Sequence, residues 1–233
     1  MRAAALAAAA LGLAATARAA SPVAGGVVMS REWRVHRGTD TVEEFSGDVR
    51  YHAGPTSVRC EEATYRHDAD SWLLRRDVSV ERTLDSGDRV AAKGQRAFLR
   101  MKDRSGWLLP GKGERLEMRR TPAEGGDPDL GRADRLDWAG EQASLTGEVH
   151  LWGPRVECWS DRADFDDRTG ELHLSGGRPS LRKFPGWTET DDWAGAVKAE
   201  DVRAWQAQRI LTADGAVTGW LEFSTPKKAR SSK

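Results

Sequence analysis

The 233-residue sequence has no excess of either charge, because 36 Lys and Arg residues balance 36 Asp and Glu residues. A protein that binds nucleic acid needs a basic surface to neutralise phosphates, so this balance argues against a nucleic-acid partner. Aliphatic side chains are also scarce: Leu, Ile, Val and Phe together number 40, and Ile occurs once. Such a composition approaches that of disordered chains, but zero net charge and ten Trp residues favour a folded domain with a small core.

The first 19 residues have the pattern of an export signal. Arg2 supplies a positive charge, residues 3–15 form a mostly apolar run, and residues 17–19 (Ala-Arg-Ala) resemble a cleavage site. The run is shorter than the about 20 residues that span a bilayer, and an uncleaved inner-membrane anchor is the alternative. We predict a periplasmic protein with a signal peptide over 1–19, a flexible linker over 20–29, a folded domain over 30–224 and a basic disordered tail over 225–233.

The sequence is poor in the residues of reactive sites. Its two cysteines, Cys60 and Cys158, suggest a disulfide in an exported protein, and two buried free thiols are the alternative. No His-x-x-x-His or Cys-x-x-Cys ligand spacing, no Gly-x-Ser-x-Gly elbow and no phosphate-binding loop is present. We therefore expect no metal, no cofactor and no enzymatic activity.

Short alternating segments dominate the remaining sequence and indicate β-strands with one buried face. Apolar and polar residues alternate over 77–81, 116–119, 147–152 and 171–174. Glycine-containing turn signals punctuate these segments at 86–88, 104–106, 168–170 and 213–215. Short strands at close spacing are typical of a sandwich, a barrel or a β-roll.

A degenerate internal repeat accompanies the alternation. Each copy begins with an acidic or amide residue and ends with an apolar or aromatic one, and each is followed by a turn and a second strand. The copies lie at 61–65, 95–99, 134–138, 161–165 and 200–204. Their unequal spacing argues against a strict solenoid and suits stacked hairpins with turns of variable length.

Two of these units resemble the signature of the OstA-like (LptA/LptC-type) lipopolysaccharide-transport family. In that family an A-D-x-h-x-h strand, where h is apolar, is followed by an L-x-G-x-h-x-h strand. The first unit here joins 133–138 to 145–149, and the second joins 163–166 to 172–179. The segment 45–51 matches the second half of such a unit, and 198–202 with 211–217 matches a whole one, so the resemblance covers about residues 30–223 and is strongest over 129–220.

The resemblance implies an all-β fold, a twisted β-jellyroll (β-taco) of stacked antiparallel hairpins that is open at both ends. Members of the family shield the acyl chains of lipopolysaccharide in transit between membranes, and they stack end to end through edge strands. The implied partners are lipopolysaccharide or a related lipid, other envelope transport proteins, and further copies of this chain. The sequence is longer and richer in Trp than the shorter members, which leaves open a bridge protein, a membrane-tethered component or a paralogue with another cargo.

The alternation also predicts which side chains would line a lipid groove. One parity within each strand collects apolar residues that would share an inner face. They are Leu136, Trp138, Leu145, Val149, Leu151, Phe165, Leu172, Leu174, Val202, Leu211 and Val217. The alternative is that these side chains only pack against one another and leave no groove.

A second hypothesis is a Trp-rich β-sandwich that binds carbohydrate. It predicts that Trp152, Trp187 or Trp193 lie exposed in one patch, where indole faces can stack on sugar rings. His150 and His173 occupy equivalent places in successive units, so we expect both on the outer face. A hydrolase on the same scaffold is a third hypothesis, for which the sequence offers no recognisable site.

Overall fold

The computed structural model describes residues 27–84, 86–154, 156–166, 168–184, 193–205, 208 and 210–223. The predicted signal peptide over 1–19 and the predicted tail over 225–233 lie outside these residues. The predicted linker over 20–29 overlaps them at its last three positions, which form the first strand.

The described residues form eighteen β-strands. The strands are β1 (Val27–Met29), β2 (Glu32–Arg37), β3 (Thr41–Ala53), β4 (Thr56–Arg66), β5 (Ser71–Thr83), β6 (Arg89–Arg100), β7 (Ser105–Leu109), β8 (Leu116–Thr121), β9 (Asp129–Ala133), β10 (Arg135–Ala139), β11 (Gln142–Trp152), β12 (Val156–Asp166), β13 (Glu171–Ser175), β14 (Ser180–Lys183), β15 (Trp193–Lys198), β16 (Asp201–Trp205), β17 (Ile210–Asp214) and β18 (Thr218–Phe223). Their pairings are antiparallel, so the predicted all-β fold of antiparallel hairpins is confirmed. None of the described residues belongs to a helix long and apolar enough to cross a membrane.

The sheet is folded lengthwise into two layers. Six long strands (β3, β4, β5, β6, β11 and β12) run through both layers and bend in the middle. Layer A contains one half of each long strand together with β2, β7, β10, β13, β16 and β17. Layer B contains the other halves together with β1, β8, β9, β14, β15 and β18.

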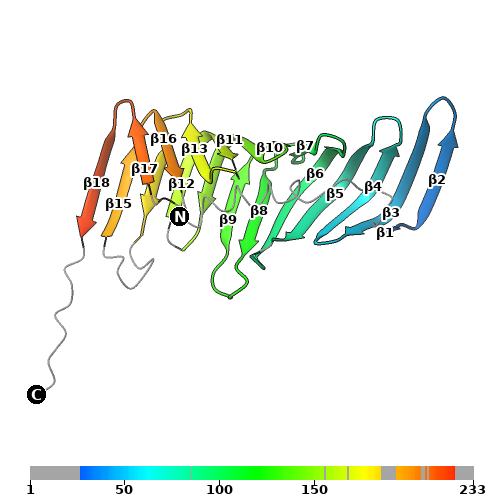
Figure 1. Ribbon diagram of the computed structural model, residues 1–233, viewed down its shortest axis with the longest axis horizontal. Coiled ribbons are helices and arrows are strands. Elements are labelled where there is room, and N and C mark those ends of the chain that lie inside the picture. The colour runs from blue at the N-terminus through cyan, green and yellow to red at the C-terminus, as the bar shows by residue number, and fades with distance from the viewer. Residues whose placement is uncertain are drawn as a thin grey trace, which may run out of the picture.

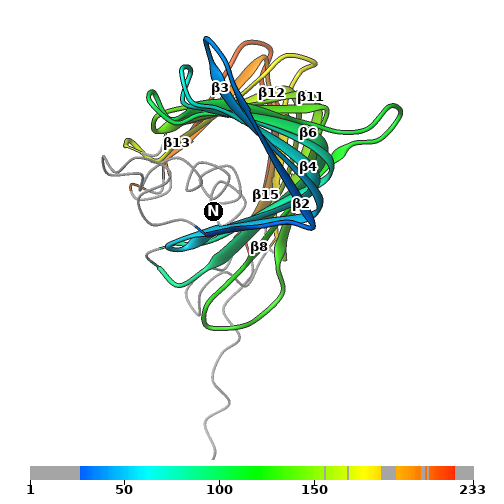
Figure 2. The ribbon, with the colours of Figure 1, turned by 90° about the vertical axis from the view of Figure 1, so that its right-hand side faces the viewer.

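Within each layer the strands follow one another in chain order along the long axis, from β2 near one end to β18 at the other (Figure 1). Seen along that axis, the layers meet on one side, which we call the spine, and diverge toward two margins, which we call the lips (Figure 2). The hairpin turns lie at the lips. Several neighbours within a layer are not consecutive strands, among them β7 and β10, β13 and β16, and β15 and β18, because the chain crosses to the other layer at the spine before it returns.

β-Bulges create the bends at the spine. The ladders of the long strands shift register between Ser46 and Val49, Arg59 and Glu62, Arg75 and Val78, and Thr146 and Val149. At one bend Gly147 and Glu148 have φ angles of +81° and +41°. A bulge with glycine in this left-handed region bends the strand and increases its twist. The glycine is also needed for space, because a Cβ at position 147 would lie 2.6 Å from the Cβ of Asp134.

The internal repeat has its structural basis at the spine, where all five copies begin. The first residue of each copy supports the bulge on a neighbouring segment. Glu61 accepts the N–H of Asp48 at 3.4 Å, and Gln95 accepts the N–H of Asp77 at 3.3 Å. The backbone N–H of Asp134 donates to the carbonyl oxygens of Thr146 and Gly147, that of Asp161 donates to Gly176, and that of Glu200 donates to Asp214 and Gly215. The first residue of each copy therefore bonds to a bend, through its side chain in two copies and through its backbone in three.

Candidate functional site

A continuous row of apolar side chains runs along the inner face of layer A. Its members are direct cross-strand partners, one from each of the twelve segments of the layer. In order they are Trp33, Phe45, Ala63, Leu74, Ala97, Leu108, Leu136, Leu145, Ala163, Leu174, Val202 and Ala213. Neighbouring strands lie about 4.8 Å apart, so the row is about 50 Å long.

Layer B presents a matching row to the same interior. It contains only apolar residues and glycine. In order the members are Val28, Tyr51, Val58, Val80, Ala92, Met118, Gly131, Leu151, Cys158, Leu181, Val197 and Gly219. The buried members of both rows belong to one hydrophobic cluster, so the two inner faces form a single interior along the molecule.

The structure places nine of the eleven predicted groove residues in this interior, each at most 7% exposed. They are Leu136, Trp138, Leu145, Val149, Leu151, Phe165, Leu172, Leu174 and Val202. Leu211 and Val217 are 42% and 52% exposed, because Leu211 lies in the last strand of layer A, which no further strand covers, and Val217 lies in the connection between β17 and β18. That these residues bind a lipid stays a prediction.

The interior reaches the surface at the two ends of the roll. At one end Trp33, on β2, is 62% exposed. At the other end Leu211 and Leu221, on β17 and β18, are 42% and 66% exposed. All three lie on the inner face, because their cross-strand partners are the inward-facing Phe45, Ala204 and Gly195. An apolar molecule could therefore contact the interior from either end.

The end near β2 carries an aromatic cluster that the sequence analysis did not single out. The ring of Trp72 lies 5.7 Å from Phe45, 5.8 Å from Tyr51 and 4.7 Å from Tyr65, measured between centroids. Burial raises the pKa of both tyrosines, and for Tyr65 the hydrogen bond to a nearby aspartate adds to the shift. The alternation over 41–46 could have predicted that Phe45 lies in the interior. The contact between the aromatic rings could not be predicted, because it depends on how β3, β4 and β5 pair.

The two cysteines are free and buried, one in each half of the molecule. The alternative of two free thiols is therefore the one observed, and no disulfide joins them. Burial raises the pKa of Cys60 to about 11 and that of Cys158 to about 12. Both thiols stay protonated at neutral pH and act as small apolar side chains.

Buried charges mark the lip of layer B. Arg82, Asp88, Asp129 and Lys183 are at most 8% exposed. Asp88 accepts a hydrogen bond from Arg120 Nε at 2.9 Å and another from the backbone N–H of Ala123 at 2.9 Å. Burial acts to raise the pKa of Asp88, but these two donors outweigh it and hold the pKa below its usual value. These two hydrogen bonds connect the β5–β6 turn to β8 and to the residues that follow it.

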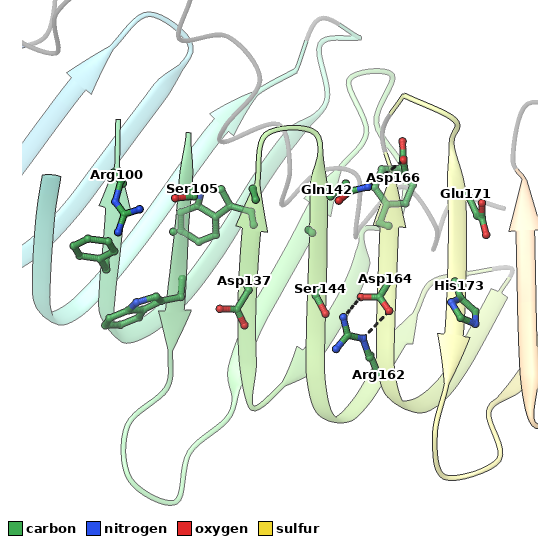
Figure 3. A pocket seen from close by; sticks show the side chains of 17 residues that line it. Arg100, Ser105, Asp137, Gln142, Ser144, Arg162, Asp164, Asp166, Glu171 and His173 are labelled. Carbon is green, nitrogen blue, oxygen red and sulfur yellow. Dashed lines mark hydrogen bonds and ion pairs between the residues drawn. The ribbon is translucent and has the colours of Figure 1, made fainter. Parts of the chain in front are cut away.

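The outer face of layer A is hollowed between β6 and β13. The hollow has a volume of about 670 Å³, and Figure 3 shows Arg100 and Ser105 on one side of it and Asp164, Glu171 and His173 on the other. The same lining includes the stacked rings of Phe98 and Trp107, whose centroids are 6.0 Å apart. Sequence analysis missed this hollow, because it depends on side-chain sizes on six adjacent strands.

The outer face of layer B carries a different aromatic group. The ring of His150 stacks on Trp152 at 4.4 Å and on Trp159 at 5.0 Å, and its Nε2 lies 2.9 Å from Glu157. Arg132 lies 5.7 Å from the centroid of the Trp152 ring, so this indole has two neighbours, His150 and Arg132. Trp187 and the side chain of Trp193 lie outside the described residues.

The histidines offer no metal site. His150 and His173 both lie on outer faces, as expected, and His173 is bonded to Asp201. Among the residues that the structure describes, no group of three or more His, Cys, Asp or Glu side chains is arranged to hold a metal ion.

Comparisons with known proteins find similarity at the level of solved structures. No protein-family model and no curated protein matches the chain. Among solved structures, it is similar to LptH from Pseudomonas aeruginosa, described as the LptA-homologous periplasmic component of the lipopolysaccharide transport device. The two are 10% identical, with a TM-score of 0.31, over 68% of this chain and 87% of that chain. The fold described above rests on the strand pairing of this chain alone, and the resemblance to the OstA-like family stays a prediction.

Proposed function

We propose that this protein binds a lipid in the interior between its two layers and carries it through the periplasm, with lipopolysaccharide as the expected cargo. The observation that supports this most strongly is the pair of unbroken apolar rows, each twelve positions long. A closed core would also bury these positions. The rows support lipid carriage because they are apolar from one end of the molecule to the other, and an acyl chain that moves along them would lose free energy at any polar step.

The energetics favour an acyl chain as the occupant. Burial of a methylene group gains about 0.8 kcal/mol, so a twelve-carbon chain gains about 10 kcal/mol before the cost of ordering it. Binding also costs free energy, because the lipid must replace the contacts between the two inner faces. The described pairings join the layers only through strands that bend at the spine, so the lips can part without breaking a β-ladder.

The ends of the roll support assembly with other envelope proteins or with copies of this chain. The described residues pair β2 only with β3, and β17 only with β16, so each strand presents a free edge. Exposed apolar side chains lie beside both edges, including Val35 and Leu221. A free edge is a template for another strand, and end-to-end pairing would join two interiors into one.

The proposal is tested at β17, the last strand of layer A, where a charge can be added without disturbing the core. Leu211 faces the interior and Ile210 faces outward, and both are exposed, at 42% and 46%. Leu211→Glu puts a carboxylate at the mouth of the interior, whereas Ile210→Glu puts the same charge on the same edge strand. We expect purified wild-type protein and Ile210→Glu to co-elute with radiolabelled lipopolysaccharide in gel filtration.

Leu211→Glu should lower the bound lipopolysaccharide about tenfold, since it brings a charge into an apolar path. Both variants alter the same edge, so a loss of end-to-end assembly would affect them equally and cannot explain a difference between them. Equal binding by the two variants, or no co-elution of lipopolysaccharide with the wild type, would contradict the proposal.

A further inference from the structure

The hollow on the outer face of layer A has a definite construction. Its floor is made by β10 and β11, whose outward residues there are short, among them Asp137, Ala139 and Ser144. The flanking strands β7 and β12 carry longer side chains, such as Trp107 and Arg162, so the outer face is concave over β10 and β11 (Figure 3). The interior lies on the opposite side of the same strands, so the hollow is separate from the proposed lipid site.

One wall of the hollow is aromatic. Phe98 and Trp107 are direct cross-strand partners, and their rings are inclined by 22°. Phe98 lies on the β6 side of Trp107, and the hollow lies on the β10 side of it. Arg96, like Phe98, comes from β6 and lies 5.9 Å from the centroid of the indole, so the side of the ring toward β10 is the one that faces across the polar floor.

The floor and the opposite wall are polar, and their arginines are already paired with carboxylates within the protein. Arg162 binds both carboxylate oxygens of Asp164, at 2.6 and 2.7 Å. Asp137 is bound in the same two-point manner by Arg135, with both distances 2.5 Å, and Arg203 bonds Glu171 at 3.0 Å. Each ion pair still has lone pairs or N–H groups to offer a ligand.

This arrangement excludes several kinds of ligand. A phosphate would need unpaired cations, and here each arginine of the floor is bound to a carboxylate. A lipid tail would leave the polar floor without hydrogen-bond partners, which is unfavourable. A molecule that fits both walls has one apolar face and a rim of neutral groups that both donate and accept hydrogen bonds. Pyranose rings have this chemistry, with axial C–H groups on one face and hydroxyl groups around the rim.

We propose that this hollow is a binding site for a neutral saccharide, with one sugar ring stacked on Trp107 and its hydroxyl groups bonded to the Arg162–Asp164 pair and Ser144. Such a ligand could be a free oligosaccharide or the glycan part of a glycolipid. The site does not depend on the interior, and it uses other residues than the tryptophans singled out from the sequence.

Titration calorimetry with the full chain tests the proposal. The probes are cellohexaose, maltohexaose and chitohexaose as free neutral sugars, the lipid-free oligosaccharide of lipopolysaccharide as the glycolipid source, and inorganic phosphate. We expect at least one oligosaccharide to bind with a Kd of about 1 mM or lower and phosphate not to bind. Which oligosaccharide binds most tightly separates the two sources.

Variants locate the binding. Trp107→Ala should weaken it at least about tenfold, because the stacking surface is lost. Ser144→Tyr should abolish it by filling the floor from an outward-facing position, without touching the core. The matched control is Trp159→Ala, which removes a 39% exposed indole from the outer face of layer B and should bind as the wild type does. Thermal unfolding shows that each variant is folded.

Failure of every oligosaccharide to bind the wild type would overturn the proposal, and so would undiminished binding by folded Ser144→Tyr. Neither result bears on lipid carriage. Conversely, Leu211→Glu should bind the sugar normally even where lipopolysaccharide binding is lost.

Discussion

Replacement of Asp88 by asparagine should destabilise the protein through the lip of layer B. The Asp88 side chain is 12% exposed, and its carboxylate is bound by Arg120 and by the backbone N–H of Ala123. Loss of its charge leaves the Arg120 guanidinium, whose side chain is only 15% exposed, facing a neutral amide. Removal of one partner from a buried ion pair costs about 3–5 kcal/mol, and the residual exposure of this pair places the cost near the lower value, about 3 kcal/mol.

Thermal unfolding followed by circular dichroism measures this cost. For a domain of this size, 3 kcal/mol corresponds to a decrease in Tm of about 6–12 °C at pH 7. The control is Glu32→Gln, which alters an ion pair to Arg34 whose side chains are 62% and 69% exposed. Exposed pairs contribute at most about 1 kcal/mol, so the control should barely move Tm.

The same pair predicts a pH dependence with a definite sign. The pKa of Asp88 is lowered in the folded state, so the folded protein holds the ionised form more strongly than the unfolded chain does. Its contribution is complete above the pKa of an unfolded aspartate, about 3.9, and is lost as the pH falls through the lower folded value. The difference in Tm between wild type and Asp88→Asn should therefore shrink below about pH 4. A difference that stays constant down to pH 2, or no difference at pH 7, would refute this account of the lip.

Three further predictions concern the spine, the thiols and the core. Gly147→Ala should lower the free energy of unfolding by about 2–4 kcal/mol in chemical denaturation, because φ is +81° and a Cβ has no space. The control Gly140→Ala should lower it by about 1 kcal/mol, because φ is +60° but nothing lies within 4 Å of the added Cβ. Equal losses would contradict the bend mechanism. Burial raises the pKa of Cys60 to about 11 and that of Cys158 to about 12, so both thiols should resist a thiol reagent at pH 8 in the native protein and react in denaturant. Rapid labelling of both thiols in the native protein would show that the interior is open to solvent. Leu145→Ala, at a fully buried position, should cost about 2–5 kcal/mol by urea unfolding, and a cost below about 1 kcal/mol would mean that the row is not packed.

Much of the fold could be predicted from the sequence, because period-two alternation is a local property of a strand. The alternating segments 77–81, 116–119, 147–152 and 171–174 lie within β5, β8, β11 and β13. The turn signal at 86–88 lies between β5 and β6, and that at 168–170 lies between β12 and β13.

The bends could be recognised only where glycine marks them. The pattern L-T-G-E at 145–148 reveals one bulge, but Arg76 and Asp77 adopt the same pair of left-handed φ angles, +62° and +49°, without a glycine. That bulge is supported by Gln95 from a neighbouring strand, at 3.3 Å and 3.2 Å. Such support depends on a contact between segments, which no local pattern contains.

The candidate sites differ in the same way. Parity within a strand assigned Leu136, Leu145 and Leu174 to the inner face, and the structure buries all three. The exposure of Leu211 follows from its place in the last strand of a layer rather than from its own sequence context. The outer hollow depends on the size of side chains across several strands, so no local sequence pattern predicts it.

Photo-crosslinking at adjacent positions of opposite parity tests the central claim most directly. A photoreactive amino acid is placed at the inward-facing Trp138, Phe165 or Met118, and in the matched controls at Glu117 or Arg119, which face outward on either side of Met118 and lie away from the outer hollow. If lipid lies between the layers, lipopolysaccharide will be crosslinked from the three inward positions and from neither outward one. Equal labelling of both parities, or labelling from the outward positions alone, would contradict an interior lipid site.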